Sequence, residues 1–328
     1  MKLIESKAEY IPQEEGLEGI YKAIELAGRT AYHSMDKITP DSAKDFVGRM
    51  IKSKHGACLE HGTMYLFYSV SCYDKEGQKL VSKYESNPYS KVIYVGVDDD
   101  KPAKNGNYYN LIGNEACGNE QYVITTNYRT LIENNWLDDL QYICFPTEFH
   151  EKRYTMRFTC SRAIAQELTR HRVFSFLMES QRYINYSKER HGGEITYIIP
   201  SWLPEIKESR VKTMLEEINV REDIETDEIS WVASCLLSVN IDAERMYFEA
   251  LENGATPQQA RDVLPNATKT ELIMTGFSSD WRFLMDLRLF EKTGKVHPDM
   301  LDLMQKAQKA MQEAGIWEDI MSKPSKFE

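Results

Sequence analysis

The densest group of residues able to do chemistry lies in the run 161–190, SRAIAQELTRHRVFSFLMESQRYINYSKER. Arg170-His171-Arg172 follows a half-apolar helical pattern, and the polar run 179–182 follows a short turn. Arginine is the residue type that holds phosphate or carboxylate through two parallel hydrogen bonds. Residues two apart on a helix point in nearly opposite directions, so Arg170 and Arg172, if both helical, would hold different anionic groups or groups shared between subunits. A solvated basic turn is the alternative interpretation.

Three further positions are candidates for the same site. Glu60-His61 directly precedes a predicted strand, and Arg261 lies in the segment ARDVLP. Arg288 ends the run DWRFLMDLR, whose apolar spacing predicts a core-facing helix. An arginine on such a helix needs an anionic partner, because an unpaired buried charge is costly. For His61 alone, a hydrogen-bonded structural histidine is the alternative interpretation.

The elements that must position these residues mix helices and strands. Periodicity and turn signals predict strands at 63–71, 121–126, 152–160, 194–200 and 269–275, and helices at 16–29, 41–53, 127–137, 161–174, 202–220, 227–253, 257–261, 278–291 and 298–313. The region 72–118 carries many turn signals around one short strand and is predicted to be loops and short strands. The pattern predicts an α+β fold in one domain, 1–328, with 72–151 as an insertion.

Composition limits the function. The chain has 328 residues, 40 Lys+Arg and 51 Asp+Glu, so its net charge is −11. This argues against a nucleic-acid-binding surface, which would be basic, but leaves room for a local anion site. No apolar run is long enough to cross a membrane, and the first residues lack the apolar stretch of a signal peptide, so we expect a cytoplasmic protein.

The six cysteines are scattered and form no CxxC pair. We therefore expect reduced, mostly buried thiols and no zinc site. None of them follows a proline or precedes a histidine. A Pro-Cys-His context, in which one class of nucleophilic cysteine stands, is therefore absent, so a covalent cysteine mechanism is not expected here.

The spacing of the arginine motif resembles the signature RHRxxSxNExSxRY of the flavin-dependent thymidylate synthases (ThyX family). The matching positions are Arg170, His171, Arg172, Ser175, Ser180, Arg182 and Tyr183. Glu60-His61, ARDVLP and DWRFLMDLR resemble further elements of that family, whereas 72–151 resembles nothing in its shorter members. The family's Asn-Glu pair falls on Leu177-Met178 here, with Glu179 displaced by one.

The resemblance implies a ThyX-like fold, with a mixed or antiparallel sheet flanked by helices. It also implies reductive methylation of dUMP to dTMP, with methylenetetrahydrofolate as carbon donor and NADPH-reduced FAD as hydride source. It implies a homotetramer with active sites between subunits, and no metal, nucleic acid or membrane partner.

The resemblance also assigns residues. Those assigned to FAD are His61, Thr63, Arg170, His171, Arg172, Glu179, Phe277, Ser278, Ser279 and Phe283. Those assigned to dUMP are Glu167, Arg170, Glu179, Ser180, Gln181, Arg182, Arg261 and Arg288. Arg288 would face the pyrimidine and stabilise charge as N3 ionises, and Arg261 would reach the phosphate from another subunit. Ser180 would position and polarise, because the motif holds no base that could make it a nucleophile.

Two other functions fit parts of the pattern. A degenerate relative would bind flavin and nucleotide without methylating, because of the changes at Leu177, Met178 and Phe283. A nucleic-acid-binding module would use the RHR run and the aromatic residues, although the net charge disfavours it.

Overall fold

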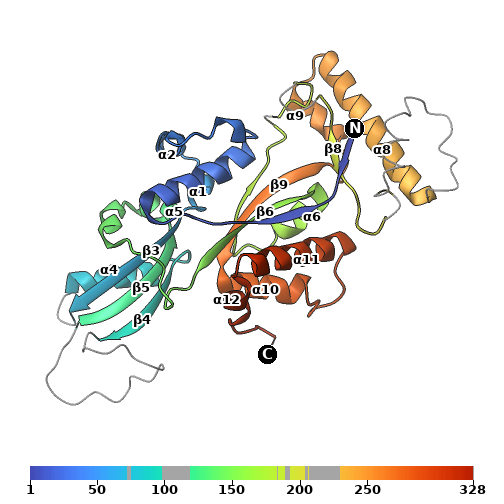
Figure 1. The fold of residues 1–328 in the computed structure, drawn as a ribbon. Helices are drawn as coiled ribbons and strands as arrows, with labels where there is room; N and C mark the ends of the chain where they lie inside the picture. Colours follow the sequence, from blue (N-terminus) through green and yellow to red (C-terminus); the bar gives the residue numbers. More distant parts are fainter. Residues whose placement is uncertain are drawn as a thin grey trace. The chain divides into compact units, whose positions relative to one another are not determined.

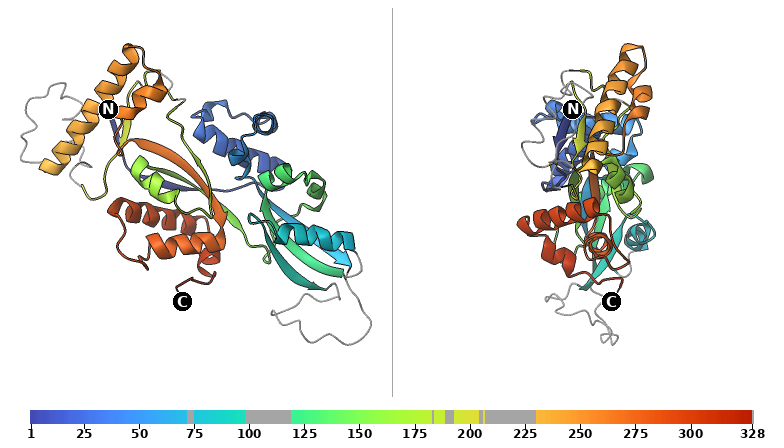
Figure 2. Two further views of the ribbon diagram at one scale, coloured as in Figure 1. Left: turned by 180° about the vertical axis from the view of Figure 1, so that it is seen from behind. Right: turned by 90° about the vertical axis from the view of Figure 1, so that its right-hand side faces the viewer.

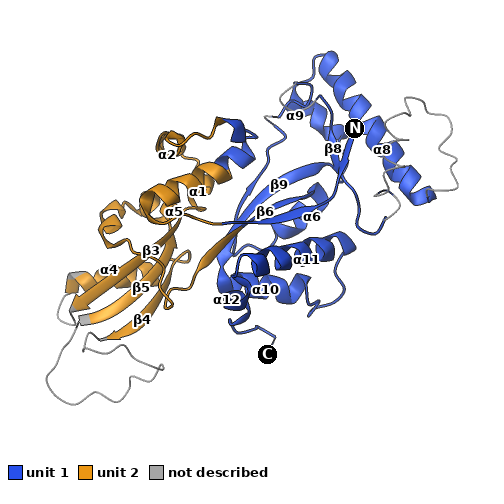
Figure 3. Cartoon of the chain, viewed as in Figure 1, with its two compact units in different colours: residues 1–11, 28–36, 156–328 blue, residues 12–27, 37–155 orange. Residues whose placement is uncertain are grey.

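The computed structural model describes residues 1–71, 75–97, 119–182, 184–188, 193–203, 206 and 230–327 (Figure 1). Helices and strands alternate along the chain, and the strand pairs include antiparallel and parallel ones. The predicted α+β class is confirmed. The chain divides into two compact units, residues 1–11, 28–36 and 156–328, and residues 12–27 and 37–155 (Figure 3).

The first unit is built on a four-stranded sheet with the order β2-β6-β9-β7. Its strands are β2 (Lys7–Ile11), β6 (Arg153–Ser161), β9 (Lys269–Phe277) and β7 (Ser175–Met178). β7 and β9 run antiparallel, with Ser175 opposite Thr275. A separate parallel pair joins β1 (Lys2–Ile4) to β8 (Thr196–Ile198).

Three helices pack on one face of the four-stranded sheet. Side chains alternate across a strand, and Phe158 of β6 points toward α10 (Ser278–Arg288), where its ring lies 6.3 Å from that of Trp281. α11 (Pro298–Glu313) packs along β2 and α10, and α12 (Trp317–Met321) contacts both helices (Figures 1 and 2). Trp281, Leu284 and Met285 of α10 are fully buried, as the apolar spacing predicted.

The other helices of the first unit are α6 (Arg162–Leu168), α8 (Trp231–Glu252), α9 (Pro257–Ala260) and the 3-10 turn η5 (Arg261–Val263). α8 begins at Ser230, whose Oγ accepts a hydrogen bond from the Ala233 amide at 3.2 Å. The predicted helix at 202–220 lies, apart from residues 202, 203 and 206, outside the described residues.

The second unit holds a three-stranded antiparallel sheet with the order β3-β5-β4. These strands are β3 (Thr63–Ser71), β5 (Asn119–Asn127) and β4 (Lys91–Val97). Its helices and 3-10 turns are α1 (Gly16–Ala31, of which 28–31 belong to the first unit), η1 (Met35–Lys37, shared in the same way), α2 (Ser42–Lys52), α3 (Gly56–Leu59), α4 (Lys75–Glu85), α5 (Tyr128–Asn134) and η2 (Leu137–Tyr142).

The region 72–118 differs in part from the prediction. It contains strand β4, as expected, but also the helix α4 in place of loops. Leu80, Val81 and Tyr84 stand at helical spacing, and Val81 packs in a cluster with Tyr68 and Val70. Gly77 and the charged residues around it are typical of a turn, so the sequence did not predict a helix from this apolar stripe. β5 pairs with β3, so the strands of the predicted insertion join a sheet that begins outside it.

Most other predicted elements are confirmed within one to three residues at each end. The helix predicted at 161–174 is an exception, because α6 ends at Leu168 and turns follow it. β6, β9, α10 and α11 stand where strands and helices were expected around the candidate site. No helix among the described residues is long and apolar enough to cross a membrane.

Candidate functional site

The arginine-rich loop, residues 169–174, leaves α6 at its C-terminal end. α6 is capped by Ser161, whose Oγ accepts from the Ile164 amide at 3.3 Å, and it ends at Leu168. Arg170 and Arg172 are therefore in turns, so the helical argument for oppositely directed side chains does not apply to them. Both side chains are exposed, and neither makes a hydrogen bond or ion pair within the described part of the chain.

His171 brings this loop to Arg288. The Nε of Arg288, the last residue of α10, donates a hydrogen bond to Nε2 of His171 at 3.1 Å. Burial, together with the charges of Arg288 and Arg170, lowers the pKa of His171 to about 4. The imidazole is therefore neutral at pH 7 and accepts the bond, while its own proton is on Nδ1. The sequence predicted an anionic partner for Arg288, and the structure supplies a neutral acceptor.

Phe174 fixes the end of the loop against α10. Its ring lies 4.8 Å from that of Trp281, nearly perpendicular to it. Gly276 of β9 permits this approach, because a Cβ at that position would lie 2.3 Å from Phe174 Cδ1. A larger residue at 276 would displace the ring, and with it the loop that carries His171.

Glu179 is held by a buried network at the end of β7. Its amide donates to the Glu271 carbonyl at 2.8 Å, while Lys269 Nζ and the Glu271 amide donate to Oε2 at 3.0 and 3.1 Å. His33 Nδ1 lies 2.9 Å from Oε1. Burial raises the pKa of Glu179, but the hydrogen bond from His33 and the charge of Lys269 outweigh it and hold the pKa below its usual value.

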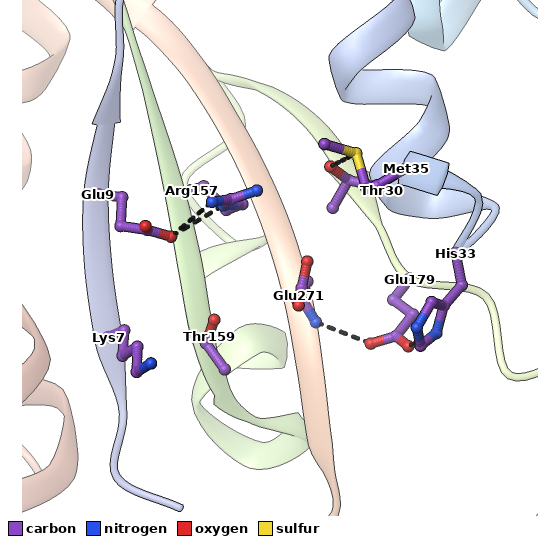
Figure 4. A pocket seen from close by; sticks show the side chains of 9 residues that line it. All are labelled: Lys7, Glu9, Thr30, His33, Met35, Arg157, Thr159, Glu179 and Glu271. Carbon is purple, nitrogen blue, oxygen red and sulfur yellow. Dashed lines mark hydrogen bonds and ion pairs between the residues drawn. The ribbon is translucent and has the colours of Figure 1, made fainter. Parts of the chain in front are cut away.

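This carboxylate lines a cavity of about 340 Å³ (Figure 4). The lining residues are Lys7, Glu9, Thr30, His33, Met35, Arg157, Thr159, Glu179 and Glu271. Arg157 and Thr159 flank Phe158 on β6, so they point to the sheet face opposite α10. Glu179 therefore lies on a different face of the sheet from the His171–Arg288 pair, although the resemblance assigned them to one site.

A second group of cations forms around Arg162, which the sequence analysis did not select. Burial lowers the pKa of Arg162 and the charge of Arg261 adds to this shift, while Tyr186 and the Glu179 carboxylate oppose it. Nη1 of Arg162 is buried with no hydrogen-bond partner among the described residues, and the same holds for Nε2 of Gln181. Gln181 and Arg162 both lie close enough to Tyr186 to act on its pKa, so the two buried donors belong to one group. Buried donors beside two like charges are suited to an anion.

The remaining candidate residues of this region are half-buried or exposed where the structure describes them. The Ser180 amide donates to the Ala31 carbonyl at 3.1 Å, and its side chain is half-buried. Arg182 is exposed, Glu167 is half-buried in α6, and Tyr183 lies outside the described residues.

The start of α10 does not present the predicted flavin contacts to solvent. Phe277 and Ser278 are buried, and Ser279 is half-buried. Phe283 stacks on Phe327 with ring centroids 5.8 Å apart, and Lys326 Nζ lies 4.4 Å from its centroid. Ser325 Oγ donates to the fully buried Asp286 at 2.6 Å, which anchors this C-terminal segment on α10.

His61 and Thr63 belong to the second unit. Burial and the charge of Arg153 lower the pKa of His61 to about 3, so it is neutral at pH 7. Thr63 exchanges two hydrogen bonds of 2.8 Å with the Gln13 side chain through its amide and carbonyl. Arg153 Nη1 donates a hydrogen bond to the Glu60 carbonyl at 3.1 Å, and this bond stabilises the turn that carries Glu60 and His61.

Three of the cysteines have thiols that are protonated at neutral pH. Burial raises the pKa of Cys58 and Cys144 to about 11 and that of Cys160 to about 12. Cys235 is exposed, and Cys72 and Cys117 lie outside the described residues. The described residues hold no group of His, Cys, Asp and Glu side chains suited to a metal ion.

Known proteins resemble this chain over the region of the site. The profile of the thymidylate synthase complementing protein family (Thy1) matches residues 129–314. The probable flavin-dependent thymidylate synthase of Paramecium bursaria Chlorella virus 1 is 27% identical over 146 residues, which cover 44% of this chain and 61% of the relative. The flavin-dependent thymidylate synthase of Pyrococcus furiosus is 29% identical over 136 residues, covering 40% and 44%.

A crystal structure of a UMP/dUMP methylase PolB from Streptomyces cacaoi, bound with 5-Br dUMP, is 13% identical with a TM-score of 0.41. It covers 98% of this chain and 97% of that one. The sequence matches span less than two thirds of each of the two named relatives. The family profile spans more than half of the present chain and includes both arginine groups, and so the chain belongs to the thymidylate synthase complementing protein family.

Proposed function

We propose that this protein is a flavin-dependent thymidylate synthase that methylates dUMP to dTMP. Methylenetetrahydrofolate would donate the carbon, and NADPH would supply the hydride through FAD. The observation that carries the proposal is the hydrogen bond that holds Arg288 against the arginine-rich loop, because it joins two of the motifs that the family shares. We also propose a homotetramer whose active sites lie between subunits.

The Arg162–Arg261 group would bind the phosphate of dUMP. Nη1 of Arg162 and Nε2 of Gln181 are buried donors with no hydrogen-bond partner among the described residues, and an anion would satisfy them. A dianionic phosphate gains more from two guanidinium groups than an uncharged nucleoside does, because charge-assisted hydrogen bonds are the stronger ones.

Arg288 would act on the pyrimidine. His171 occupies its Nε, so the two terminal Nη groups are left to face a ligand. Positive charge beside the ring stabilises the anion that forms as N3 loses its proton, and this raises the nucleophilicity of C5. No thiolate is needed, which agrees with the raised thiol pKa values.

The loop residues fit a flavin nucleotide, whereas the start of α10 fits it less well. The exposed guanidinium groups of Arg170 and Arg172 have no partner in the described chain and suit an anionic diphosphate. Phe277 and Ser278 are buried, and Phe283 is covered by Phe327. FAD, when bound, supplies the hydride transfer, while the protein supplies position and charge.

An absorbance spectrum from 300 to 550 nm, with and without dUMP, tests the proposal. We expect bands near about 375 and 450 nm, as for oxidised flavin, that shift on addition of dUMP. A protein that gains no such bands after incubation with FAD would support the degenerate-relative alternative, in which the changes at Leu177, Met178 and Phe283 have cost the cofactor.

A further inference from the structure

We infer that His171 positions Arg288 for nucleotide binding, as a neutral hydrogen-bond acceptor, rather than serving mainly as a flavin contact. The inference rests on the proposed function for what Arg288 binds, but its geometric basis does not. The two side chains are 3.1 Å apart, and both are half-buried.

The loop that holds His171 leaves its ring little freedom. The His171 amide donates to the Leu168 carbonyl at 3.0 Å, and its carbonyl accepts from the Phe174 amide at 3.1 Å. Phe174 is in turn packed on Trp281 of α10. The histidine is thus tied to the helix that carries Arg288, so the acceptor and the donor move together.

The charges around the ring favour a neutral imidazole. Among the described residues, the charged groups that act on it are Arg288 from α10 and Arg170 from the loop, and both are cations. A protonated ring would be repelled by both and would lose the lone pair that accepts from Arg288. The guanidinium keeps its full charge in this arrangement, because its partner has none.

The bond also selects which edge of Arg288 meets a ligand. A carboxylate partner would commonly take two parallel bonds and occupy one whole edge of the guanidinium. A single imidazole nitrogen takes only the Nε–H, so both Nη groups remain to donate. The arrangement therefore fixes the side chain while preserving four donors for the nucleotide.

Nuclear magnetic resonance of 15N-histidine-labelled protein tests the geometry without reference to activity. The chain has seven histidines, and His171→Gln identifies the resonances of one of them. We expect the Nδ1–H tautomer for His171, unprotonated at pH 6. An Nε2–H tautomer or an imidazolium at that pH would overturn the inference.

A double-mutant cycle tests the role. We expect His171→Ala to weaken dUMP binding in equilibrium dialysis by about ten- to hundredfold, as for the loss of a hydrogen bond to a charged group. The double variant with Arg288→Ala should bind no more weakly than Arg288→Ala alone, because the two residues act as one unit. His171→Gln, whose amide oxygen can replace Nε2 as acceptor, should restore most of the affinity.

Flavin content separates this role from a cofactor contact. We expect His171→Ala to keep its flavin absorbance at 450 nm per chain within twofold of the wild type. Loss of flavin with unchanged dUMP affinity, or additive losses in the cycle, would overturn the inference. If the wild type binds neither dUMP nor flavin, the proposed function fails, and the tautomer measurement still decides whether the geometry is right.

Discussion

At the scale of residues, chemistry depends on which charges are left unsatisfied by the protein itself. In the Glu9–Arg157 and Lys269–Glu179 pairs each charge has an opposite charge as its partner, so these pairs stabilise the fold. Within the described part of the chain, Arg162 keeps a buried donor without a partner, and the hydrogen bond of Arg288 is to a neutral ring. These two arginines are therefore the ones that a ligand would change most.

Replacement of Arg288 tests the role at the pyrimidine. We expect Arg288→Ala to lower kcat by about 10²–10³, the usual cost of removing one donor that stabilises a developing anion. Flavin content should stay within twofold of the wild type. Turnover near the wild-type rate would show that charge at this position is not used.

Replacement of Arg162 tests the phosphate group. We expect Arg162→Ala to weaken dUMP binding by about ten- to hundredfold, because a charge-assisted hydrogen bond is lost. Binding of deoxyuridine, which lacks the phosphate, should be nearly unchanged and serves as the matched control. Equal loss for both ligands in calorimetric titrations would place Arg162 away from the phosphate.

The sequence selected Arg170, Arg261 and Arg288 as candidates, because their motifs resemble those of a known family. It missed Arg162, which looks like an ordinary first residue of a helix. Arg162 is a candidate for anion binding because its Nη1 is buried and because it lies near Arg261, a residue far along the chain. The resemblance also grouped Glu179 with Arg288, although alternation across the sheet puts that carboxylate in a cavity on the face opposite α10.

At the scale of elements, the site depends on how β7, β9 and α10 are held together. The Glu179 network ties the end of β7 to β9 and to the turn after α1. Helix α10 was predictable, since its apolar stripe is strong. Helix α4 was not, because its three apolar residues only become a stripe once a sheet is present to receive them.

The Glu179 network makes stability depend on pH in a defined direction. The folded-state pKa of Glu179 is depressed, so its stabilisation is present above the unfolded value near 4.5 and is lost as pH falls through the folded value. We expect Glu179→Gln to lower the free energy of unfolding by about 3 kcal/mol at pH 7, and by a smaller amount at pH 4, where the unfolded state begins to take up the proton.

Urea titrations at both pH values measure this difference. Glu9→Gln is the matched control, because Glu9 also pairs with a cation at the cavity but is 45% exposed. It should cost less than about 1 kcal/mol at either pH. If the loss of unfolding free energy in Glu179→Gln is the same at the two pH values, the lowered pKa assigned to Glu179 is contradicted.

Gly276 tests the packing of the arginine-rich loop on α10. We expect Gly276→Ala to destabilise the protein by about 1–3 kcal/mol, because the new methyl group overlaps the Phe174 ring. Gly48→Ala, in an exposed position of α2 with open space around it, should instead stabilise by about 0.5–1 kcal/mol. Thermal unfolding of both variants checks these signs, and equal effects would refute the packing argument.

At the scale of the whole molecule, the question is whether one chain completes a site. Arg162 and Arg261 lie near each other within one chain, and His171 and Arg288 are hydrogen-bonded within one chain. The resemblance nevertheless implies that Arg261 contacts the nucleotide bound at another subunit. Co-refolding inactive Arg162→Ala with inactive Arg288→Ala chains tests this. Random mixing should restore about a quarter of the wild-type activity if each site takes the two arginines from different chains. No recovery would mean that both arginines serve the same chain's site.

The most direct test of the central claim is product formation. The purified protein is incubated with dUMP, methylenetetrahydrofolate, NADPH and FAD, and dTMP is measured by mass spectrometry, with Arg288→Ala as control. We expect dTMP from the wild type only when all four compounds are present, and little from the variant. The account would be contradicted by a flavin-bearing wild type that binds dUMP and yields no dTMP.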